Sequence, residues 1–278
     1  MSPSALTAHE KREFASEIKF LLDPATAALV RTWARAHLAA DPNAQGPASD
    51  TYAVTSIYFD TAELDVFHRR GRHHHSKFRV RRYGGGSLFF ERKLKIRGRL
   101  AKRRTPVTAT DVACLSGLPA ATTWPGFWFQ QKIAARQLRP QCQIDYERTA
   151  RVLTTAAGPI RLTLDEAIRA RPADEIRFHD ASDATPVTDH VVLELKYRRE
   201  FPALFRTLVE QFALNPRPFS KYRTALPALG LVPASTTAAT FRQCRCARER
   251  PQPHRWRASR KPQAPRLRHA LTSPPLRK

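Results

Sequence analysis

The sequence predicts an α+β fold in which an antiparallel β-sheet closes into a barrel and helices pack on its outside. Segments with the alternating pattern of β-strands outnumber the helical segments, and most of them are joined by hairpin-like links. Several strand-like segments also carry apolar residues at one set of alternate positions and charged residues at the other. A barrel accounts for both observations, because it turns the apolar faces outward beneath helices and the charged faces inward.

The strands are expected where β-branched and aromatic residues are concentrated or alternate with polar ones. Residues 51–60 (TYAVTSIYFD) are a strong example, and 76-SKFRVRRYGGGSLFFERKLKI-96 predicts a hairpin that turns at its three glycines. The predicted strands, in chain order, are 14–22, 51–60, the two arms of the hairpin at 76–96, 142–153, 159–170 and 190–198.

Helices are expected between these strands. Asp23 and Pro24 supply an N-cap and a first helical residue for an alanine-rich helix that is expected to run to about Ala40. The other predicted helices cover about 61–70, 125–139 and 201–213, and a last ordered segment covers 219–230. The remaining segments are a loop at 41–50 and a basic stretch at 99–107.

The chain is strongly basic. Its 278 residues carry a formal net charge of +24, which suggests a polyanionic partner. Residues 233–278 are rich in arginine and proline and hold Glu249 as their one acidic residue, so we expect a disordered basic tail. Residues 1–12 are expected to form a loose leader, and the ordered domain is expected to span 13–232. That domain is basic in its own right.

The sequence also excludes several classes of protein. The four cysteines have no spacing that predicts a disulfide framework or a zinc site. No apolar run is long enough for a transmembrane segment, and the N-terminus lacks the core of a signal peptide. Gly84-Gly85-Gly86 is not a P-loop, because the lysine that such a loop requires does not follow it. We therefore expect a cytoplasmic protein, and whether it has a membrane partner stays open.

Cations share one register on neighbouring strands of the predicted hairpin. Lys77, Arg79 and Arg81 lie two residues apart and so share a face, and across the turn Glu91 and Lys93 do the same. An open sheet with its charged face in water is one explanation. Like charges would then oppose each other across strands at some cost, whereas inside a barrel they would attract a polyanion strongly. We therefore expect the aligned cations to bind phosphates.

Eight short motifs cover nearly the whole predicted domain. In chain order they are Glu17-Ile-Lys19-Phe, 56-SIYFDT-61, 79-RVRRY-83, 90-FERK-93, 146-YERTA-150, 161-RLTLD-165, 193-LELK-196 and 219-FSKY-222. Together they resemble the VTC domain, which belongs to the triphosphate tunnel metalloenzymes of the CYTH-like superfamily. The resemblance implies an eight-stranded antiparallel tunnel that binds ATP and polyphosphate with a divalent cation, Mn2+ or Mg2+. It further implies an ATP-dependent polyphosphate polymerase, an enzyme that transfers the γ-phosphate of ATP to a growing chain.

The resemblance also assigns roles to individual residues. The cations implied in catalysis are Arg79, Arg81, Lys93, Arg148, Arg161 and Lys196. The same cations are implied in phosphate binding, together with Lys19, Lys102, Ser220 and Lys221. Glu194 is implied as the metal ligand, and a carboxylate suits Mg2+ or Mn2+. No covalent intermediate is implied, because phosphoryl transfer mainly requires positioning and charge stabilisation.

Three other functions stay open. A tunnel triphosphatase would hydrolyse inorganic or nucleoside triphosphate, but Ala15 replaces one carboxylate of the E-x-E-x-K strand that is typical of that branch. A non-catalytic polyphosphate-binding module would need the same cations but not the metal carboxylate Glu194. A nucleic-acid-binding protein would depend mainly on the basic tail, which could equally hold polyphosphate or an anionic lipid surface, or be a solubilising extension.

Other chemistry-bearing residues are given structural interpretations. The histidines 73-HHH-75 are consecutive, so they cannot all face one metal ion from a strand, and we expect a solvated loop. Trp124, Trp128 and Phe129 could stack on bases but are expected to belong to the core. Asp60 is expected to cap the end of its strand.

Overall fold

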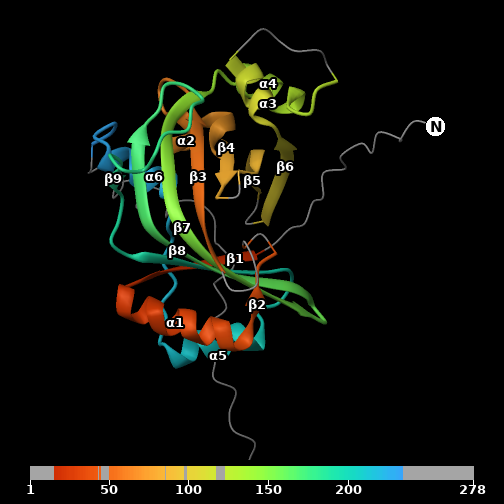
Figure 1. The fold of residues 1–278 in the computed structure, drawn as a ribbon, viewed down its shortest axis with the longest axis vertical. Helices are drawn as coiled ribbons and strands as arrows, with labels where there is room; N and C mark the ends of the chain where they lie inside the picture. Colours follow the sequence, from red (N-terminus) through yellow and green to blue (C-terminus); the bar gives the residue numbers. More distant parts are fainter. Residues whose placement is uncertain are drawn as a thin grey trace, which may run out of the picture. The chain divides into compact units, whose positions relative to one another are not determined.

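One antiparallel sheet organises the residues that the computed structural model describes, which are 16–42, 44, 50–84, 86–96, 99–116 and 123–233 (Figure 1). The chain divides into two compact units, Met1–Arg242 and Gln243–Lys278, and every described residue lies in the first. The predicted leader 1–12 and the predicted tail beyond Pro233 lie outside the described residues.

The main strands follow the order β1-β10-β8-β7-β3-β4-β5-β6, and each is antiparallel to its neighbours. Two short strands are attached to this path, because β2 pairs with β7 and β9 pairs with β8. The strands are β1 (Ser16–Leu22), β2 (Ala39–Ala40), β3 (Thr51–Asp60), β4 (Ser76–Tyr83), β5 (Leu88–Ile96), β6 (Arg99–Val107), β7 (Arg139–Thr155), β8 (Gly158–Pro172), β9 (Thr185–Pro186) and β10 (Val191–Tyr197).

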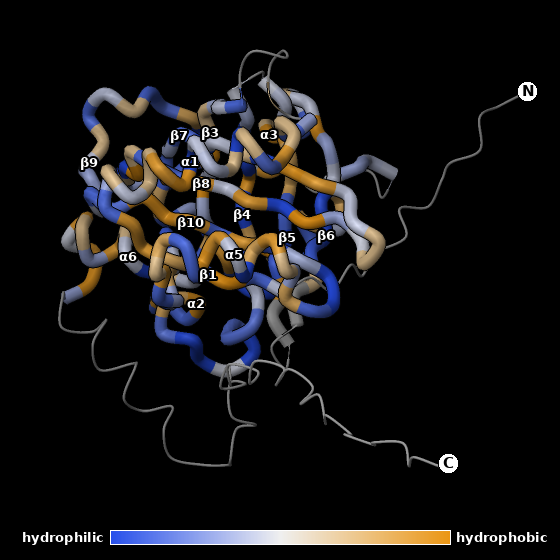
Figure 2. Tube along the Cα trace, turned by 90° about the horizontal axis from the view of Figure 1, so that it is seen from below, coloured by the Kyte–Doolittle hydropathy of each residue, from blue (hydrophilic) through white to orange (hydrophobic). Residues whose placement is uncertain are grey.

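Each predicted strand is present, and the sheet contains more than the sequence predicted. The basic stretch 99–107 is the strand β6, because its backbone pairs with β5 along its whole length. The short strands β2 and β9 were not predicted. In Figure 2, hydrophobic and hydrophilic residues alternate along the strands, which is the pattern from which the sheet was predicted.

The helices are α1 (Pro24–His37), α2 (Asp65–His68), α3 (Ala109–Ala113), α4 (Phe127–Ala134), α5 (Ala203–Gln211) and α6 (Lys221–Ala228). α1 begins as predicted, because the Asp23 carboxylate accepts a hydrogen bond from the backbone N–H of Thr26 at 2.9 Å. It ends before Ala40, because Ala39 and Ala40 pair with β7 instead. None of the helices in the described ranges is long and apolar enough to span a bilayer.

Helices α1 and α5 cover the apolar face of β1, β10 and β8 (Figure 1). Val30 and Trp33 of α1 and Phe205 and Leu208 of α5 are buried in this layer. The strands contribute the buried side chains of Phe20, Leu162, Leu164, Leu193 and Leu195. Burial of one such side chain stabilises the fold by about 1.5–3 kcal/mol, so this layer fixes which face of the strands points outward.

Helix α4 covers the neighbouring part of the sheet through Phe129, which is fully buried. The ring of Phe129 stacks on Phe90 at 4.8 Å and meets Phe59 and Phe78 edge-on at 5.7 Å each. These three partners come from β5, β3 and β4 and lie on the same face of the sheet. The charged residues at the alternate positions of these strands therefore point to the opposite face.

The sheet is not closed by backbone hydrogen bonds. β1 and β6 are the two ends of the strand order, and no pairing joins them among the described residues. The antiparallel sheet with outer helices is confirmed, but the closed barrel that the sequence predicted is not. The basic residues and Pro106 of β6 hinder pairing at an edge. Side chains link the ends instead, because Lys93 of β5 donates to both carboxylate oxygens of Glu17 of β1 at 3.1 Å.

Candidate functional site

The face of the sheet that points away from α1, α4 and α5, here called the inner face, carries the charged side chains of the strands. Its cations are Lys19, Lys77, Arg79, Arg81, Lys93, Lys102, Arg104, Arg148, Arg161 and Lys196, and α6 adds Lys221. Its carboxylates are Glu17, Glu91, Asp165 and Glu194. The cations outnumber the carboxylates, so the inner face is a surface for an anionic ligand.

The strand register places opposite charges beside each other at most of these positions. Across β1 and β10, Glu17 pairs with Lys196 and Lys19 with Glu194. Arg79 lies opposite Glu91 and Arg148 opposite Asp165 in the same way. Like charges oppose each other at two places on the inner face: Lys77, Lys93 and Lys102 follow one another across β4, β5 and β6, and Lys196 of β10 lies opposite Arg161 of β8. The expected repulsion across strands is therefore mostly relieved by carboxylates.

Glu91 is the acidic centre of the β4–β6 end of the inner face and is 1% exposed. Arg79 binds it through Nε at 2.7 Å and Nη2 at 2.6 Å, and Lys102 also reaches it. Arg104 and Arg81 lie farther away, at 3.4 Å and 3.7 Å. Burial raises the pKa of Glu91, but Arg79, Lys102 and Arg81 outweigh burial and hold the pKa well below its usual range. The carboxylate is therefore ionised and fixes these cations.

Asp165 forms a second acidic centre and is fully buried. Arg148 binds both of its oxygens, with distances of 2.6 Å from Nε and 2.7 Å from Nη2. Lys221, the first residue of α6, also binds Asp165. Burial favours the neutral carboxyl, but Arg148 and Lys221 lower the pKa of Asp165 below its usual value. Asp165 therefore connects the sheet to α6.

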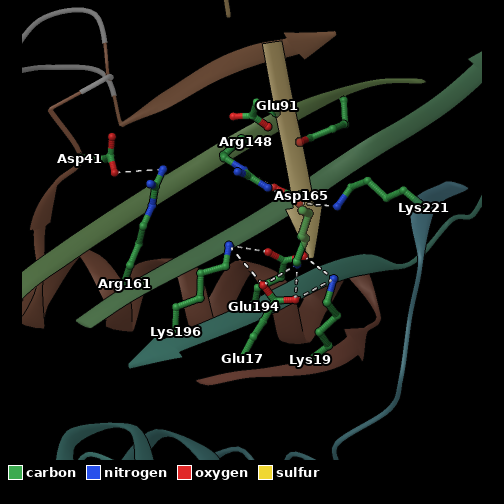
Figure 3. A network of polar contacts seen from close by, with 12 residues as sticks. Glu17, Lys19, Asp41, Glu91, Arg148, Arg161, Asp165, Glu194, Lys196 and Lys221 are labelled. Atoms are coloured by element: carbon green, nitrogen blue, oxygen red, sulfur yellow. Dashed lines mark hydrogen bonds and ion pairs between the residues drawn. The ribbon is translucent and has the colours of Figure 1, made fainter. Parts of the chain in front are cut away.

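Glu194 and Glu17 form the third acidic centre, shown in Figure 3. Lys19 donates to one oxygen of Glu194 at 2.5 Å and Lys196 to the other at 2.6 Å. Lys93 reaches Glu17 from β5 and is thereby held beside this group. Burial and the charge of Glu194 raise the pKa of Glu17, but Lys93, Lys19 and Lys196 outweigh them and lower it to about 2.

Arg161 lies apart from these three centres. Its guanidinium group binds Asp41 at 3.0 Å and the hydroxyl oxygen of Tyr52 at 3.0 Å, and Figure 3 shows it pointing away from Glu194. Arg161 was predicted for the site, but its contacts with Asp41 and Tyr52 hold it at the edge of the inner-face cations. The structure places the other predicted strand cations around Glu91, Asp165, Glu194 and Glu17.

Helix α6 brings Ser220, Lys221 and Tyr222 against the inner face. Ser220 accepts a hydrogen bond from Lys77 Nζ at 2.7 Å, and Tyr222 donates its hydroxyl to Asp60 at 2.6 Å. Asp60 also accepts the backbone N–H groups of Thr61, Val66 and Phe67, at 2.8, 2.7 and 2.9 Å. The predicted structural role of Asp60 is confirmed, because it caps α2 and fixes α6 at the end of β3.

The aromatic and histidine residues that the sequence singled out lie away from the inner-face charges. Phe129 is buried, and Trp124 and Trp128 pack against the same core cluster, as predicted. The predicted solvated histidine loop is wrong for His73, which is buried at the end of a single helical turn, Gly71–His73. Within the described residues, no group of three or more His, Cys, Asp or Glu side chains is placed to hold a metal ion.

A divalent metal would find a suitable pair of ligands in Glu194 and Glu17. Mg2+ and Mn2+ prefer carboxylate oxygens, and Mg2+ commonly uses one or two carboxylates together with substrate phosphates. Lys19 and Lys196 hold the pKa of Glu194 well below its usual range against burial, so it is ionised near neutral pH. The two oxygens already accept bonds from these lysines, so a metal would compete with them.

Several residues of the inner face received no role from the sequence. Glu17, Glu91 and Asp165 stand inside the quoted motifs, but their function as partners of cations depends on strand register. Lys77 was expected to bind phosphate only as one of the aligned cations, and the resemblance gave it no role of its own. The signal that could have identified them is alternation, because every second residue of these strands points to the inner face.

The antiparallel sheet, with helices on one face and a cation-rich inner face on the other, indicates an α+β protein that binds an anionic ligand. More particularly, residues 14–229 match the VTC domain, and the chain belongs to the VTC domain family. This match confirms the resemblance that the eight motifs indicated.

Solved structures provide further similarities. The chain is similar to a candidate adenylate cyclase from Bacillus halodurans, with a TM-score of 0.48 and 13% identity over 75% of this chain and 94% of that one. It is also similar to a candidate adenylyl cyclase from Hippeastrum, described as having a dominant triphosphatase activity, with a TM-score of 0.45 and 14% identity over 79% and 98% of the two chains. An inorganic triphosphatase has a TM-score of 0.26 and 13% identity over 76% and 97%. No curated protein matches the chain significantly.

Proposed function

We propose that the protein is an ATP-dependent polyphosphate polymerase whose reaction takes place on the inner face. The observation that carries the proposal is the convergence of Lys19, Lys93 and Lys196 on Glu17 and Glu194 from three strands. A phosphate chain carries negative charge along its length, and such a surface can hold it by many charge-assisted hydrogen bonds. Membership of the VTC domain family supports the same ligand.

In the proposed reaction, a terminal phosphate oxygen of the chain attacks the γ-phosphorus of ATP. A new P–O–P linkage forms, the bond from the γ-phosphorus to the bridging oxygen breaks, and ADP leaves with that electron pair. The transition state spreads negative charge over the oxygens of the transferred group, so fixed Arg and Lys donors stabilise it. Arg79, Arg81 and Arg148 suit bidentate contacts with phosphate, and the lysines act as point charges.

The resident carboxylates have a role in this proposal. In the free protein they neutralise part of the cationic charge, which limits the repulsion that a bare row of cations would suffer. Glu91 and Asp165 also hold the guanidinium groups of Arg79 and Arg148 in fixed orientations. A bound phosphate then meets donors that are already positioned, and little reorganisation is needed when charge develops.

Glu194 and Glu17 are the residues that would hold the divalent metal in this proposal. When bound, Mg2+ or Mn2+ supplies positive charge to the phosphate oxygens of the nucleotide. The protein's own contribution is to keep both carboxylates ionised and to hold Lys19 and Lys196 next to them.

A tunnel triphosphatase is the second candidate, and it is supported by Glu17 beside Glu194 as much as the polymerase is. This pair of ionised carboxylates would serve a hydrolase as well as a polymerase, because the two reactions differ in the nucleophile that attacks the γ-phosphorus. Water in place of the chain would release phosphate. Ala15 counts against this candidate, because the hydrolytic branch typically has a carboxylate at that position of its E-x-E-x-K strand.

The test is to incubate the purified protein with ATP, Mn2+ and a short polyphosphate primer and to resolve the products by gel. A ladder of lengthening chains is expected for the wild type. Glu194→Gln should reduce the rate about 100-fold or more. Lys196→Met should also reduce it, while Glu194 keeps its bond from Lys19.

Arg177→Met is the matched control for lost positive charge, because Arg177 is 71% exposed and lies outside the inner face. It should leave the ladder unchanged. Shortening chains or free phosphate would assign the protein to the hydrolase branch. Tight polyphosphate binding without turnover, unaffected by Glu194→Gln, would show a binding module.

A further inference from the structure

Lys77 differs from the other cations of the inner face. It belongs to the row Lys77, Lys93 and Lys102 that crosses β4, β5 and β6. Lys93 binds Glu17 and Lys102 binds Glu91, but the recorded partner of Lys77 Nζ is the neutral Ser220 Oγ at 2.7 Å. Within the described residues, Lys77 is thus the inner-face cation for which no ion pair with a carboxylate is found.

The charged groups that act most strongly on Lys77 are of its own sign. Lys93 faces it from β5, Lys19 from β1, Arg69 from the segment after α2, and Arg223 from α6. Burial and these cations hold the pKa of Lys77 well below its usual range. An environment without a carboxylate is unfavourable for a lysine unless an anion joins it.

Arg223 of α6 is a second buried cation for which no carboxylate partner is found among the described residues. It is 5% exposed, its guanidinium group lies over the ring of Phe67 at 5.5 Å, and its Nε and Nη2 atoms have no hydrogen-bond partner. It lies three residues after Ser220, which accepts the backbone N–H of Arg223 at the start of α6. Buried guanidinium donors without partners are rare in folded proteins, and an unseen ligand is one of their few explanations.

We propose that Lys77, Ser220 and Arg223 form a phosphate subsite that binds one phosphate group of the chain held on the inner face. The proposal rests on the ligand class of the proposed function. Elsewhere on the inner face, a phosphate has to compete with a resident carboxylate for each cation. At Lys77 it meets an ammonium and a hydroxyl for which no ion pair with a carboxylate is found among the described residues, and the charge of Arg223 acts on the same place. This end of the site should therefore contribute a large part of the binding affinity.

Binding at this subsite has a consequence for protons. A phosphate beside Lys77 favours the charged ammonium, so binding should draw a proton from solution whenever the free protein holds Lys77 partly neutral. The contribution of Lys77 to affinity should therefore weaken as the pH rises, because a neutral amine has to be protonated first. Arginine at this position would stay charged at every accessible pH.

The experiment is calorimetric titration with inorganic triphosphate in EDTA, so that neither metal nor turnover is involved. Lys77→Met and Arg223→Met should each weaken binding about ten-fold, which is the loss expected for a charge-assisted contact. Titration in two buffers of different ionisation enthalpy should show proton uptake by the wild type. Lys77→Arg should restore the affinity and abolish the uptake. Arg177→Met, which removes an exposed charge, should change neither.

The outcomes separate this subsite from the proposed polymerase. If folded Lys77→Met binds triphosphate as tightly as the wild type, the subsite is wrong, whatever the polymerase assay shows. If Lys77→Met weakens binding but the wild type makes no polyphosphate, the subsite stands and the polymerase fails. If the wild type binds no triphosphate without metal, the subsite is overturned, and the polymerase assay with Mn2+ decides the proposed function separately. Thermal unfolding of each variant establishes that it is folded.

Discussion

Lys93 and Glu17 join the two ends of the open sheet, with both carboxylate oxygens 3.1 Å from the lysine nitrogen. Lys93→Met should lower the free energy of unfolding by about 1 kcal/mol, because Glu17 loses a partner that holds β5 near β1, while burial, which lowers the pKa of Lys93, offsets part of the stabilisation. Denaturant unfolding measures the change. Lys132→Met, at an exposed position of α4, is the control and should have little effect. Equal stability of the two variants would mean that this ion pair does not hold the ends together.

Glu17 should make the stability of the protein sensitive to acid. Its pKa is about 2 in the folded protein and 4.5 as the ordinary value. A lowered carboxyl pKa contributes stability that is present above pH 4.5 and is lost as the pH falls toward 2. Glu17→Gln should therefore be about 2–3 kcal/mol less stable than the wild type at pH 6. The difference should shrink to nothing near pH 2.

The control for this prediction is Glu175→Gln, since Glu175 is 59% exposed. Denaturation curves recorded between pH 2 and 6 provide the measurement. A constant difference between wild type and Glu17→Gln at all pH values would contradict the electrostatic explanation.

Lys77→Met should stabilise the free protein, by on the order of 1–2 kcal/mol at neutral pH. The pKa of Lys77 is lower in the folded protein than in the unfolded chain, so the penalty is present at low pH and is relieved as the pH rises toward 10.5. The gain from methionine should accordingly shrink at high pH. Thermal unfolding at several pH values tests this. A destabilised Lys77→Met would show that the bond to Ser220 outweighs the repulsion.

Tyr83 should report on the charge of the inner face. Burial raises its pKa, but Arg81, supported by Lys102 and Arg104 and opposed by Glu91, lowers it to about 7. The near-ultraviolet absorbance of tyrosinate should therefore show a titration step near pH 7 that Tyr83→Phe lacks. Added triphosphate should move the step to higher pH, because its negative charge disfavours the phenolate. Identical titrations of wild type and Tyr83→Phe would refute the assignment.

The strands could be predicted because their signal is local. Alternation along 51–60 and 159–170 is visible in the sequence alone, and β3 and β8 lie at these positions. The strand at 99–107 could not be assigned, because its basic composition lacks this contrast and its conformation depends on pairing with β5. The end of α1 was misplaced for a similar reason. Alanine favours a helix, but the backbone of Ala40 pairs with β7 in the folded chain.

The cations of the site could be predicted from motifs, but their partners could not. Whether Arg148 lies opposite Asp165 depends on the register of β7 and β8, which includes a shift between Asp145 and Glu147. The absence of a carboxylate beside Lys77 also follows from register and from the position of α6. Such relations arise from residues far apart in the chain, and no local pattern encodes them.

Helix α6 is attached to the sheet by Ser220, Lys221 and Tyr222, which bind Lys77, Asp165 and Asp60. These partners belong to β4, β8 and β3, all made earlier in the chain, whereas α6 is the last helix of the described residues. During synthesis from the N-terminus, the sheet can therefore assemble before this side of its inner face is complete. A nascent chain whose α6 is still inside the ribosome would carry most of the inner-face cations but would lack the polar groups at the start of α6. The ability to bind a ligand at this end of the inner face would thus appear late, when α6 packs against the sheet, and would not increase gradually as each strand is added.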